Sequence, residues 1–238
     1  MNLLPLVQCG VCVAALLSAP PARSDCPDLA LVLAIDASGS IDKAEHAIQM
    51  QGYAAAFASP EVHRAISSAG KVSVAVVLWG DGTMPAQVIP FRRLDTIAET
   101  GAFGETLLST PRRVTGNTGL GRGMAEAVAL LETTAHCAMR RVIDVSGDGK
   151  ESFSPHSWHN VPLAPVREKA ASLGIIVNGL AITLDTPDLA DYYREHLIVG
   201  PGAFVMAVAG FDDFAEAILR KLVREIAIPE LASMDLPP

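Results

Sequence analysis

Residues 29–35 form an unbroken apolar run, Leu-Ala-Leu-Val-Leu-Ala-Ile, which stops at the polar segment Asp36-Ala-Ser-Gly-Ser40. A strand with one wet face would alternate apolar and polar residues, so this run predicts a strand buried on both faces. Such a strand belongs in a parallel sheet that carries helices above and below it. This single segment therefore already favours an α/β architecture.

The rest of the chain alternates between strand and helix patterns. Gly80-Asp-Gly-Thr83 is a turn signal, so the strands on either side of it are expected to form a hairpin. Ser40 is a candidate N-cap for the first helix. The alternation predicts a doubly wound, mostly parallel sheet with helices on both faces, whose ligands bind beyond the carboxyl ends of the strands. The expected strands are 72–79, 87–91, 141–146, 175–184 and 203–208, and the expected helices are 41–59, 95–108, 120–134, 165–173, 187–196 and 211–226.

Composition limits the classes of function. The chain has 238 residues, of which 50% are hydrophobic and 18% charged, which suits one domain with a large core. The formal net charge is −8, and this excludes a protein that binds nucleic acid by following its phosphates.

The first 24 residues differ from the rest. Residues 3–17 are mostly apolar, and small residues at Ala22 and Ser24 suggest a signal peptide, 1–24, cut near Ser24. The apolar stretch is shorter than the roughly 20 residues that a membrane span needs. The alternatives are a retained anchor or a disordered tail. We therefore expect an exported protein, periplasmic or extracellular, with a domain over 25–228 and a flexible tail over 229–238.

Five oxygen-bearing side chains are candidate ligands for a hard cation. Asp36, Ser38 and Ser40 occupy alternate positions after the first strand, Thr118 lies in the glycine-rich loop 115–119, and Asp148 follows a later strand. If the sheet is as predicted, all five lie at its carboxyl edge, and Mg²⁺ prefers about six oxygen ligands. Taken singly, each also has a structural explanation, as a helix cap or as a turn residue.

These segments resemble the metal-ion-dependent adhesion site of von Willebrand factor type A domains. The resemblance covers about residues 27–227. It implies a six-stranded sheet with one antiparallel edge strand, and one Mg²⁺ or Mn²⁺ held directly by Ser38 and Ser40, directly or through water by Thr118, and largely through water by Asp36 and Asp148. It also implies a cation-dependent binding module whose protein partner offers an Asp or Glu to the ion.

The downstream half is also similar to a bacterial subgroup of exported proteins with this domain. The similar segments are 141–148, 192–193, 200–204 and 221–227. The strand motif Ser-Gly-Asp-Gly departs from the more frequent Thr-Asp-Gly, so Asp144 is a less favoured rival of Asp148 as the ligand.

Two cysteines remain after the leader, and export favours a disulfide between them. Cys26 precedes Asp36 by ten residues and Cys137 precedes Asp148 by eleven. If their strands are parallel neighbours, both cysteines lie at the opposite end of the sheet from the metal, within the usual Cα separation of about 4.4–6.8 Å. Two free buried thiols are the alternative.

Other functions are weaker hypotheses. A cation beside Asp36 could polarise a phosphate ester, so a metal-dependent phosphoester hydrolase is an alternative, although no base or nucleophile is evident and we expect no enzyme. A structural envelope protein with vestigial metal loops is another. His156 and His159 have a spacing that zinc sometimes uses, but no third ligand is evident.

Overall fold

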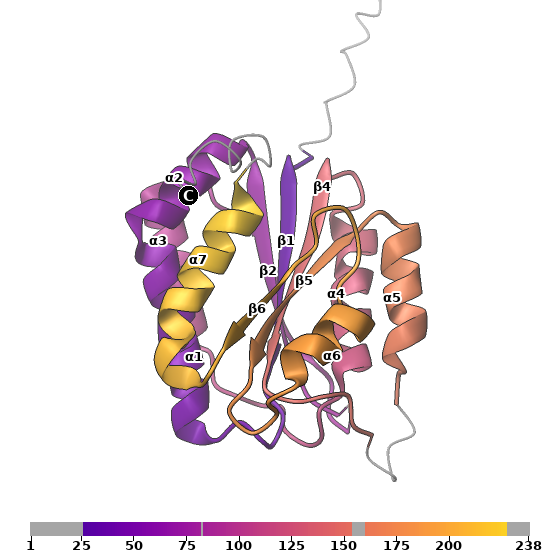
Figure 1. Cartoon of the computed structure of the whole chain (residues 1–238). Helices are drawn as coiled ribbons and strands as arrows, with labels where there is room; N and C mark the ends of the chain where they lie inside the picture. Colours follow the sequence, from indigo (N-terminus) through magenta and orange to yellow (C-terminus); the bar gives the residue numbers. More distant parts are fainter. Residues whose placement is uncertain (1–25, 82, 154–159, 228–238) are drawn as a thin grey trace, which may run out of the picture.

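The computed structural model describes residues 26–81, 83–153 and 160–227. Its centre is a six-stranded sheet in the order β3-β2-β1-β4-β5-β6 (Figure 1). β3 is antiparallel to β2, and every other neighbouring pair is parallel. The expected fold class, with one antiparallel edge strand, is therefore confirmed. The strands are β1 (Leu29–Asp36), β2 (Val72–Trp79), β3 (Gln87–Arg93), β4 (Arg140–Gly147), β5 (Ile176–Ile182) and β6 (Val205–Val208).

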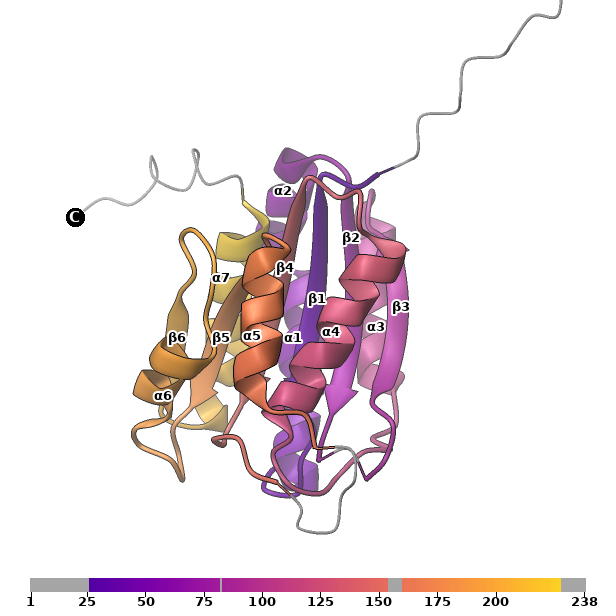
Figure 2. The ribbon, with the colours of Figure 1, turned by 90° about the vertical axis from the view of Figure 1, so that its right-hand side faces the viewer.

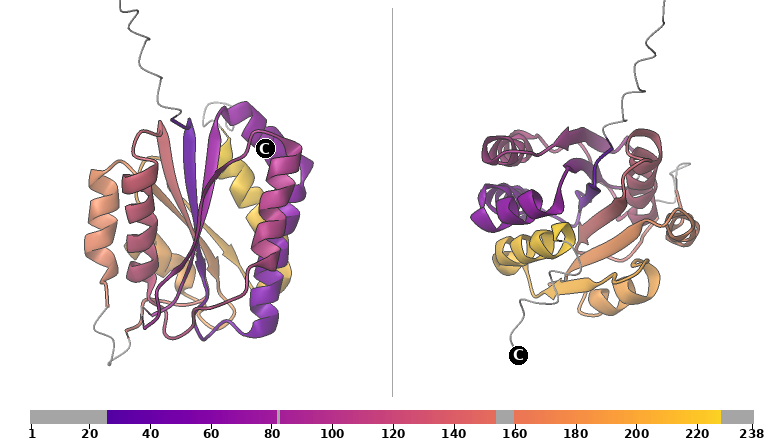
Figure 3. Two further views of the ribbon diagram at one scale, coloured as in Figure 1. Left: turned by 180° about the vertical axis from the view of Figure 1, so that it is seen from behind. Right: turned by 90° about the horizontal axis from the view of Figure 1, so that it is seen from above.

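Helices cover both faces of the sheet. The view from above shows α1, α3 and α7 on one side and α4, α5 and α6 on the other (Figure 3). A short 3-10 turn, η1 (Phe211–Asp213), leads into α7. The α-helices are α1 (Lys43–Ala58), α2 (Pro60–Ala69), α3 (Ile97–Ser109), α4 (Leu120–Thr134), α5 (Leu163–Ser172), α6 (Leu189–His196) and α7 (Phe214–Ile226).

The β1 strand lies between two separate apolar cores. All of its residues are buried. Leu31 and Leu33 pack into the core beneath α1, α2 and α7, whereas Val32 and Ala34 pack into the core beneath α4 and α5. The unbroken apolar run thus has the predicted cause, which is a strand covered on both faces.

Two features of the first crossover differ from expectation. Helix α1 begins two residues later than expected, because Asp42 rather than Ser40 is its N-cap and shares a capping box with Glu45. Helix α2 is absent from the expected elements. Its start signal is nevertheless in the sequence: Ser59 accepts a hydrogen bond from the backbone N–H of Val62, and a proline occupies the first turn.

The strand order places β1 at the point where the chain changes direction across the sheet. From β1 the chain passes through α1 and α2 to β2 on one side, whereas β4 lies on the other side of β1. The loops that follow β1 and β4 gather at the lower end of the molecule in Figure 2. A crevice for ligands is expected at this kind of switch point.

The opposite end of the sheet carries the disulfide. Cys26 and Cys137 are bonded, with their Cα atoms 5.6 Å apart, just before β1 and β4. The expected pairing and its position relative to the candidate site are both present. Within the described part of the chain, no helix has the length and apolar character to cross a membrane. The expected leader, 1–24, and tail, 229–238, lie outside the described residues.

Candidate metal-binding site

The oxygens of the first and last candidate segments meet at the switch point. In the register between β1 and β4, Ile35 lies opposite Ser146, so Asp36 and Asp148 follow on neighbouring strands. The hydroxyl of Ser40 donates to Asp148 Oδ1 at 2.8 Å, and the hydroxyl oxygens of Ser38 and Ser40 are 3.2 Å apart. Segments more than one hundred residues apart in the chain thus share one cluster of oxygens.

Asp36 presents one free carboxylate oxygen inside this cluster. Its Oδ1 accepts a hydrogen bond from the backbone N–H of Ser38 at 2.8 Å, which shapes the loop into a tight turn. Its Oδ2 is buried and has no hydrogen-bond partner among the described residues. A buried carboxylate oxygen without a partner is costly, so an orphaned oxygen at such a place fits a bound cation.

Thr118, on a third loop, lies beside the loop that carries Asp148. Its hydroxyl Oγ1 lies so near Gly149 that a Cβ on that glycine would be only 2.9 Å from it. The hydroxyl does not cap α4, because Gly119 is the N-cap and no side chain caps that helix end. The structural alternative for this threonine, a helix cap, is therefore wrong.

Asp144 is not part of the cluster. It lies in the middle of β4, fully buried, and forms an ion pair with Lys221 of α7. The rival assignment of the downstream ligand to Asp144 has no support in the geometry, and Asp148 is the aspartate that contacts Ser40.

Both aspartates of the cluster have a raised pKa. Burial, together with the nearby charge of Asp148, raises the pKa of Asp36 to about 7. Burial likewise raises the pKa of Asp148. The site thus concentrates negative charge in a buried place where positive charge is in short supply.

Arg112 holds the loop that carries Asp36, Ser38 and Ser40. Its guanidinium donates to the carbonyl oxygens of Ala37 at 2.9 Å, Ile41 at 2.7 Å and Val114 at 3.2 Å, and also to that of Ser38. A planar guanidinium with five N–H donors can serve several acceptors at once. The sequence offered no signal for this residue, because its partners are backbone atoms of loops whose shape a sequence does not reveal.

Glu151 and Ser152 hold the threonine loop from the other side. The carboxylate of Glu151 accepts from the backbone N–H of Gly121 at 3.0 Å and of Leu163 at 3.2 Å, near the N-terminal ends of α4 and α5. Ser152 and Thr118 exchange two hydrogen bonds, one of 3.0 Å to the serine hydroxyl and one of 2.9 Å to the threonine carbonyl. Sequence reasoning missed both residues, although an acid after a strand and before a helix is a usable signal.

Gly116 brings its loop into close contact with the loop after β1 and with Asp81 after β2. Its backbone φ is +101°, and a Cβ there would lie 2.4 Å from the carboxylate carbon of Asp81. Its carbonyl oxygen accepts from the backbone N–H of Gly39 at 2.6 Å. Only glycine combines this conformation with this close approach.

The donor set fits a hard divalent cation. It consists of two carboxylates and three hydroxyls, and oxygen ligands of this kind suit Mg²⁺ or Mn²⁺. Across residues 26–81, 83–153 and 160–227 there is no group of three or more histidine, cysteine or acidic side chains arranged to hold a metal ion. The zinc hypothesis rests on His156 and His159, which lie outside the described residues.

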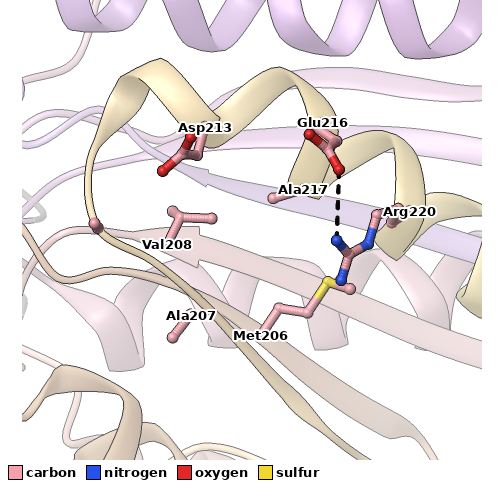
Figure 4. A pocket seen from close by; sticks show the side chains of 8 residues that line it. Met206, Ala207, Val208, Asp213, Glu216, Ala217 and Arg220 are labelled. Atoms are coloured by element: carbon pink, nitrogen blue, oxygen red, sulfur yellow. Dashed lines mark ion pairs between the residues drawn. The ribbon is translucent and has the colours of Figure 1, made fainter.

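A second surface feature lies apart from these loops. A groove of about 310 Å³ runs between the edge strand β6 and α7. Met206 and Val208 contribute to its lining, and the ion pair between Glu216 and Arg220 crosses its rim at 3.6 Å (Figure 4). None of the five candidate ligands lines it.

The sheet order and helix layers define a von Willebrand factor type A-like fold, as comparison with solved structures shows. A von Willebrand factor type A protein from Catenulispora acidiphila matches with a TM-score of 0.59 and 19% identity over 84% of this chain and 43% of its own. The chain belongs to the family described as "Protein of unknown function (DUF1194)", whose model matches residues 25–230.

Two further structures share the fold. The pilus adhesin SpaC from Lactobacillus rhamnosus GG matches with a TM-score of 0.59 and 14% identity over 85% of this chain and 30% of its own. Proximal thread matrix protein 1 from the mussel byssus, in a form whose adhesion-site motif is occupied by zinc, matches with a TM-score of 0.55 and 14% identity over 84% and 48%. This chain spans less than half the length of each of the three proteins. No curated protein sequence matches the chain.

Proposed function

We propose that this chain is an exported binding module that holds one divalent cation, Mg²⁺ or Mn²⁺, and recognises a protein partner through it. Ser38, Ser40 and Thr118 would supply hydroxyl ligands, and Asp36 and Asp148 carboxylates. The observation that carries the proposal is the convergence of three loops on one point, with Ser40 bonded to Asp148 and with Asp36 Oδ2 buried and unpartnered.

The donor set favours binding over turnover. Three of the five ligands are neutral hydroxyls, so a bound cation keeps a strong demand for a further anionic oxygen. A carboxylate of a partner, Asp or Glu, would meet that demand. The fold neighbours include a pilus adhesin and a byssus matrix protein with zinc in its motif, and these support adhesion as the class of function.

Export is a second part of the proposal. A disulfide between Cys26 and Cys137 suits an oxidising compartment, outside the cytoplasm. The apolar segment within 1–24 would act as the signal peptide, and we place the mature protein in the periplasm or outside the cell.

The cation is tested by titrating the purified chain with Mn²⁺ and following the free ion by electron paramagnetic resonance. We expect one ion per chain in the wild type, competition by Mg²⁺, and loss of binding in Asp148→Asn and in the double variant Ser38→Ala with Ser40→Ala. The matched control is Asp95→Asn, because Asp95 is an exposed acid paired with Arg93. Wild-type protein without a bound ion at millimolar Mn²⁺ would refute the proposal.

The partner chemistry is tested with an array of peptide pairs in which each Asp or Glu peptide has an Asn or Gln twin. We expect binding to acidic members in Mn²⁺, none to their amide twins, and none in chelator. Equal binding to both members of a pair would mean that the ion does not take a carboxylate.

A further inference from the structure

A buried lysine lies between two buried carboxylates where α7 packs on the sheet. Lys221 and Asp144 are completely inaccessible to solvent, and Glu225 is nearly so. The amine Nζ of Lys221 forms an ion pair with Asp144 Oδ1 and lies 2.6 Å from Glu225 Oε1. This trio takes no part in the candidate metal site.

The local structure fixes the three side chains relative to one another. Lys221 and Glu225 are four residues apart on α7 and therefore point from the same side of that helix. Asp144 projects from β4 next to Asn178 of β5, its partner in the strand register. The amide Nδ2 of Asn178 donates to Glu225 Oε1 at 2.9 Å, which holds the glutamate in place.

The trio is buried, and its surroundings are partly aromatic. The ring of Phe204 lies against Lys221, with its centroid 5.6 Å from Nζ. Glu225 Oε2 and both carboxylate oxygens of Asp144 have no hydrogen-bond partner among the described residues, although Asp144 Oδ1 forms the ion pair with Lys221. Burial, followed by the charge of Asp144, raises the pKa of Glu225 to about 8, while the ammonium of Lys221 acts in the opposite direction.

We infer that Lys221 and Asp144 are the two ends of an intramolecular isopeptide bond, and that Glu225 is the proton-transfer group for its formation. The geometry places an amine against a carboxyl group, with a second acid 2.6 Å from the same amine, and buries all three side chains.

The reaction is a condensation without oxidation or reduction. The ammonium of Lys221 first gives a proton to the Asp144 carboxylate, and the neutral Nζ then attacks Cγ, forming the C–N bond. Glu225 protonates the departing oxygen of Asp144 and takes the remaining surplus proton from Nζ. The C–O bond breaks, one water leaves, and Glu225 returns to its acid form. The product is a secondary amide that joins α7 to β4.

The buried location favours the amide over the separate groups. A buried pair of charges is held at a high desolvation cost, whereas an amide is neutral. Fixed neighbours also react as though at a very high concentration, because no entropy remains to be lost in bringing them together. A positioned acid of raised pKa is the usual means of moving protons in such a step.

Peptide mass spectrometry of the reduced full chain tests the inference directly. Trypsin cannot cut after a lysine whose amine is acylated, so we expect a branched peptide in which 142–150 is joined to 221–224. The intact mass should be lower than the sequence mass by one water. A folded wild type that has the full sequence mass and yields peptide 222–224 would overturn the inference and leave an ordinary buried ion pair.

Variants assign the roles. Lys221→Arg and Glu225→Gln should each give only unbranched peptides, whereas Glu216→Gln, an exposed acid on the same helix, should keep the branch. If Lys221→Arg or Glu225→Gln fails to fold, the peptide map of the wild type still shows whether the bond between Lys221 and Asp144 is present. A branch carrying Asn178, with the loss of ammonia instead of water, would overturn the assignment to Asp144. A branch retained in folded Glu225→Gln would overturn the role of Glu225.

Discussion

Replacing Asp36 with Asn should stabilise the metal-free protein. The pKa of Asp36 rises from 3.8 to about 7 on folding, chiefly because the carboxylate is buried and secondly because Asp148 lies nearby. At 1.36 kcal/mol per pKa unit, keeping this group ionised at pH 8 costs on the order of 4 kcal/mol. Part of this 4 kcal/mol is offset, because the loop relaxes around the charge in the wild type and the buried amide of the variant lacks hydrogen-bond partners. We therefore expect Asp36→Asn to raise the unfolding free energy by about 2 kcal/mol.

The pH dependence has a definite sign. The folded-state pKa of Asp36 lies above its unfolded value, so between about pH 3.8 and pH 7 the unfolded chain releases this proton while the folded chain retains it. This group therefore makes the wild type lose stability as the pH rises through that window. Asp36→Asn lacks this contribution, and the difference between the two proteins should grow from pH 4 to pH 7 and then level off.

Magnesium should reverse the order of stability. A ligand that binds only the folded state at one hundred times its dissociation constant adds about 2.7 kcal/mol, and the variant should gain almost none of this. Urea unfolding followed by circular dichroism, in chelator and in Mg²⁺, measures both effects. The control, Asp95→Asn, should shift neither curve by more than about 0.5 kcal/mol. A variant that is less stable than wild type in chelator, or that gains as much from Mg²⁺, would refute the reasoning.

Three further predictions concern the supports of the site and the far end of the sheet. Arg112→Lys keeps the positive charge but loses the several N–H donors that bind the loop carbonyls, so the affinity for Mn²⁺ should fall by about tenfold. Arg113→Lys is the control and should leave the affinity unchanged. Equal affinities of wild type and Arg112→Lys in the Mn²⁺ titration would contradict the role of Arg112 in holding the loop. Glu151→Gln should lower the unfolding free energy by about 1–2 kcal/mol in urea, because an acid at two helix N-termini is lost; an unchanged midpoint would argue against this role. Replacing both Cys26 and Cys137 by serine should lower the unfolding free energy by about 4 kcal/mol, because the disulfide joins residues 111 positions apart. A loss below about 1 kcal/mol in urea unfolding would contradict this loop-closure argument.

Patterns of burial explain why the fold could be predicted from the sequence. The run 29–35 can only be a strand covered on both faces, and the structure places its alternate residues in two different cores. The limits of the elements were less predictable. The N-cap of α1 is Asp42 instead of Ser40, because Asp42 forms a capping box with Glu45.

The candidate ligands were predicted from the sequence, whereas the residues that hold their loops, Arg112 and Glu151, were not. Asp36, Thr118 and Asp148 each follow or precede a regular element, and a parallel sheet brings such positions to one edge. Arg112 and Glu151 bind backbone atoms of loops, and the position of a loop carbonyl or amide is set by the folded structure alone. The sequence gives no signal for Arg112, whereas for Glu151 the position of an acid between a strand and a helix was a usable signal.

The buried trio left one clue in the sequence, for which metal binding was only a less favoured explanation. A charged residue inside an apolar strand, Asp144 between Ile143 and Val145, needs a compensating group. The sequence suggested a metal ion as the rival explanation. The structure supplies Lys221 instead, from a helix of 13 residues near the end of the domain, and only the packing of α7 against β4 and β5 reveals that pairing.

The metal site and the proposed isopeptide bond both involve β4. Together they limit how the metal site can change when a partner binds. Side chains of a strand alternate between faces, so Asp144 and Ser146 share the face of β4 that looks toward α1 and α7, and Asp148 follows at the end of the strand. Asp144 ties this strand to α7, while Ser146 contacts the hydroxyl of Tyr53 on α1 at 3.1 Å. A covalent bond at Asp144 would prevent α7 from sliding along the sheet. A partner would then bind to a metal site that is already formed in the free protein. The affinity for the cation should therefore change on binding of an acidic peptide only by the contribution of the peptide's own carboxylate ligand.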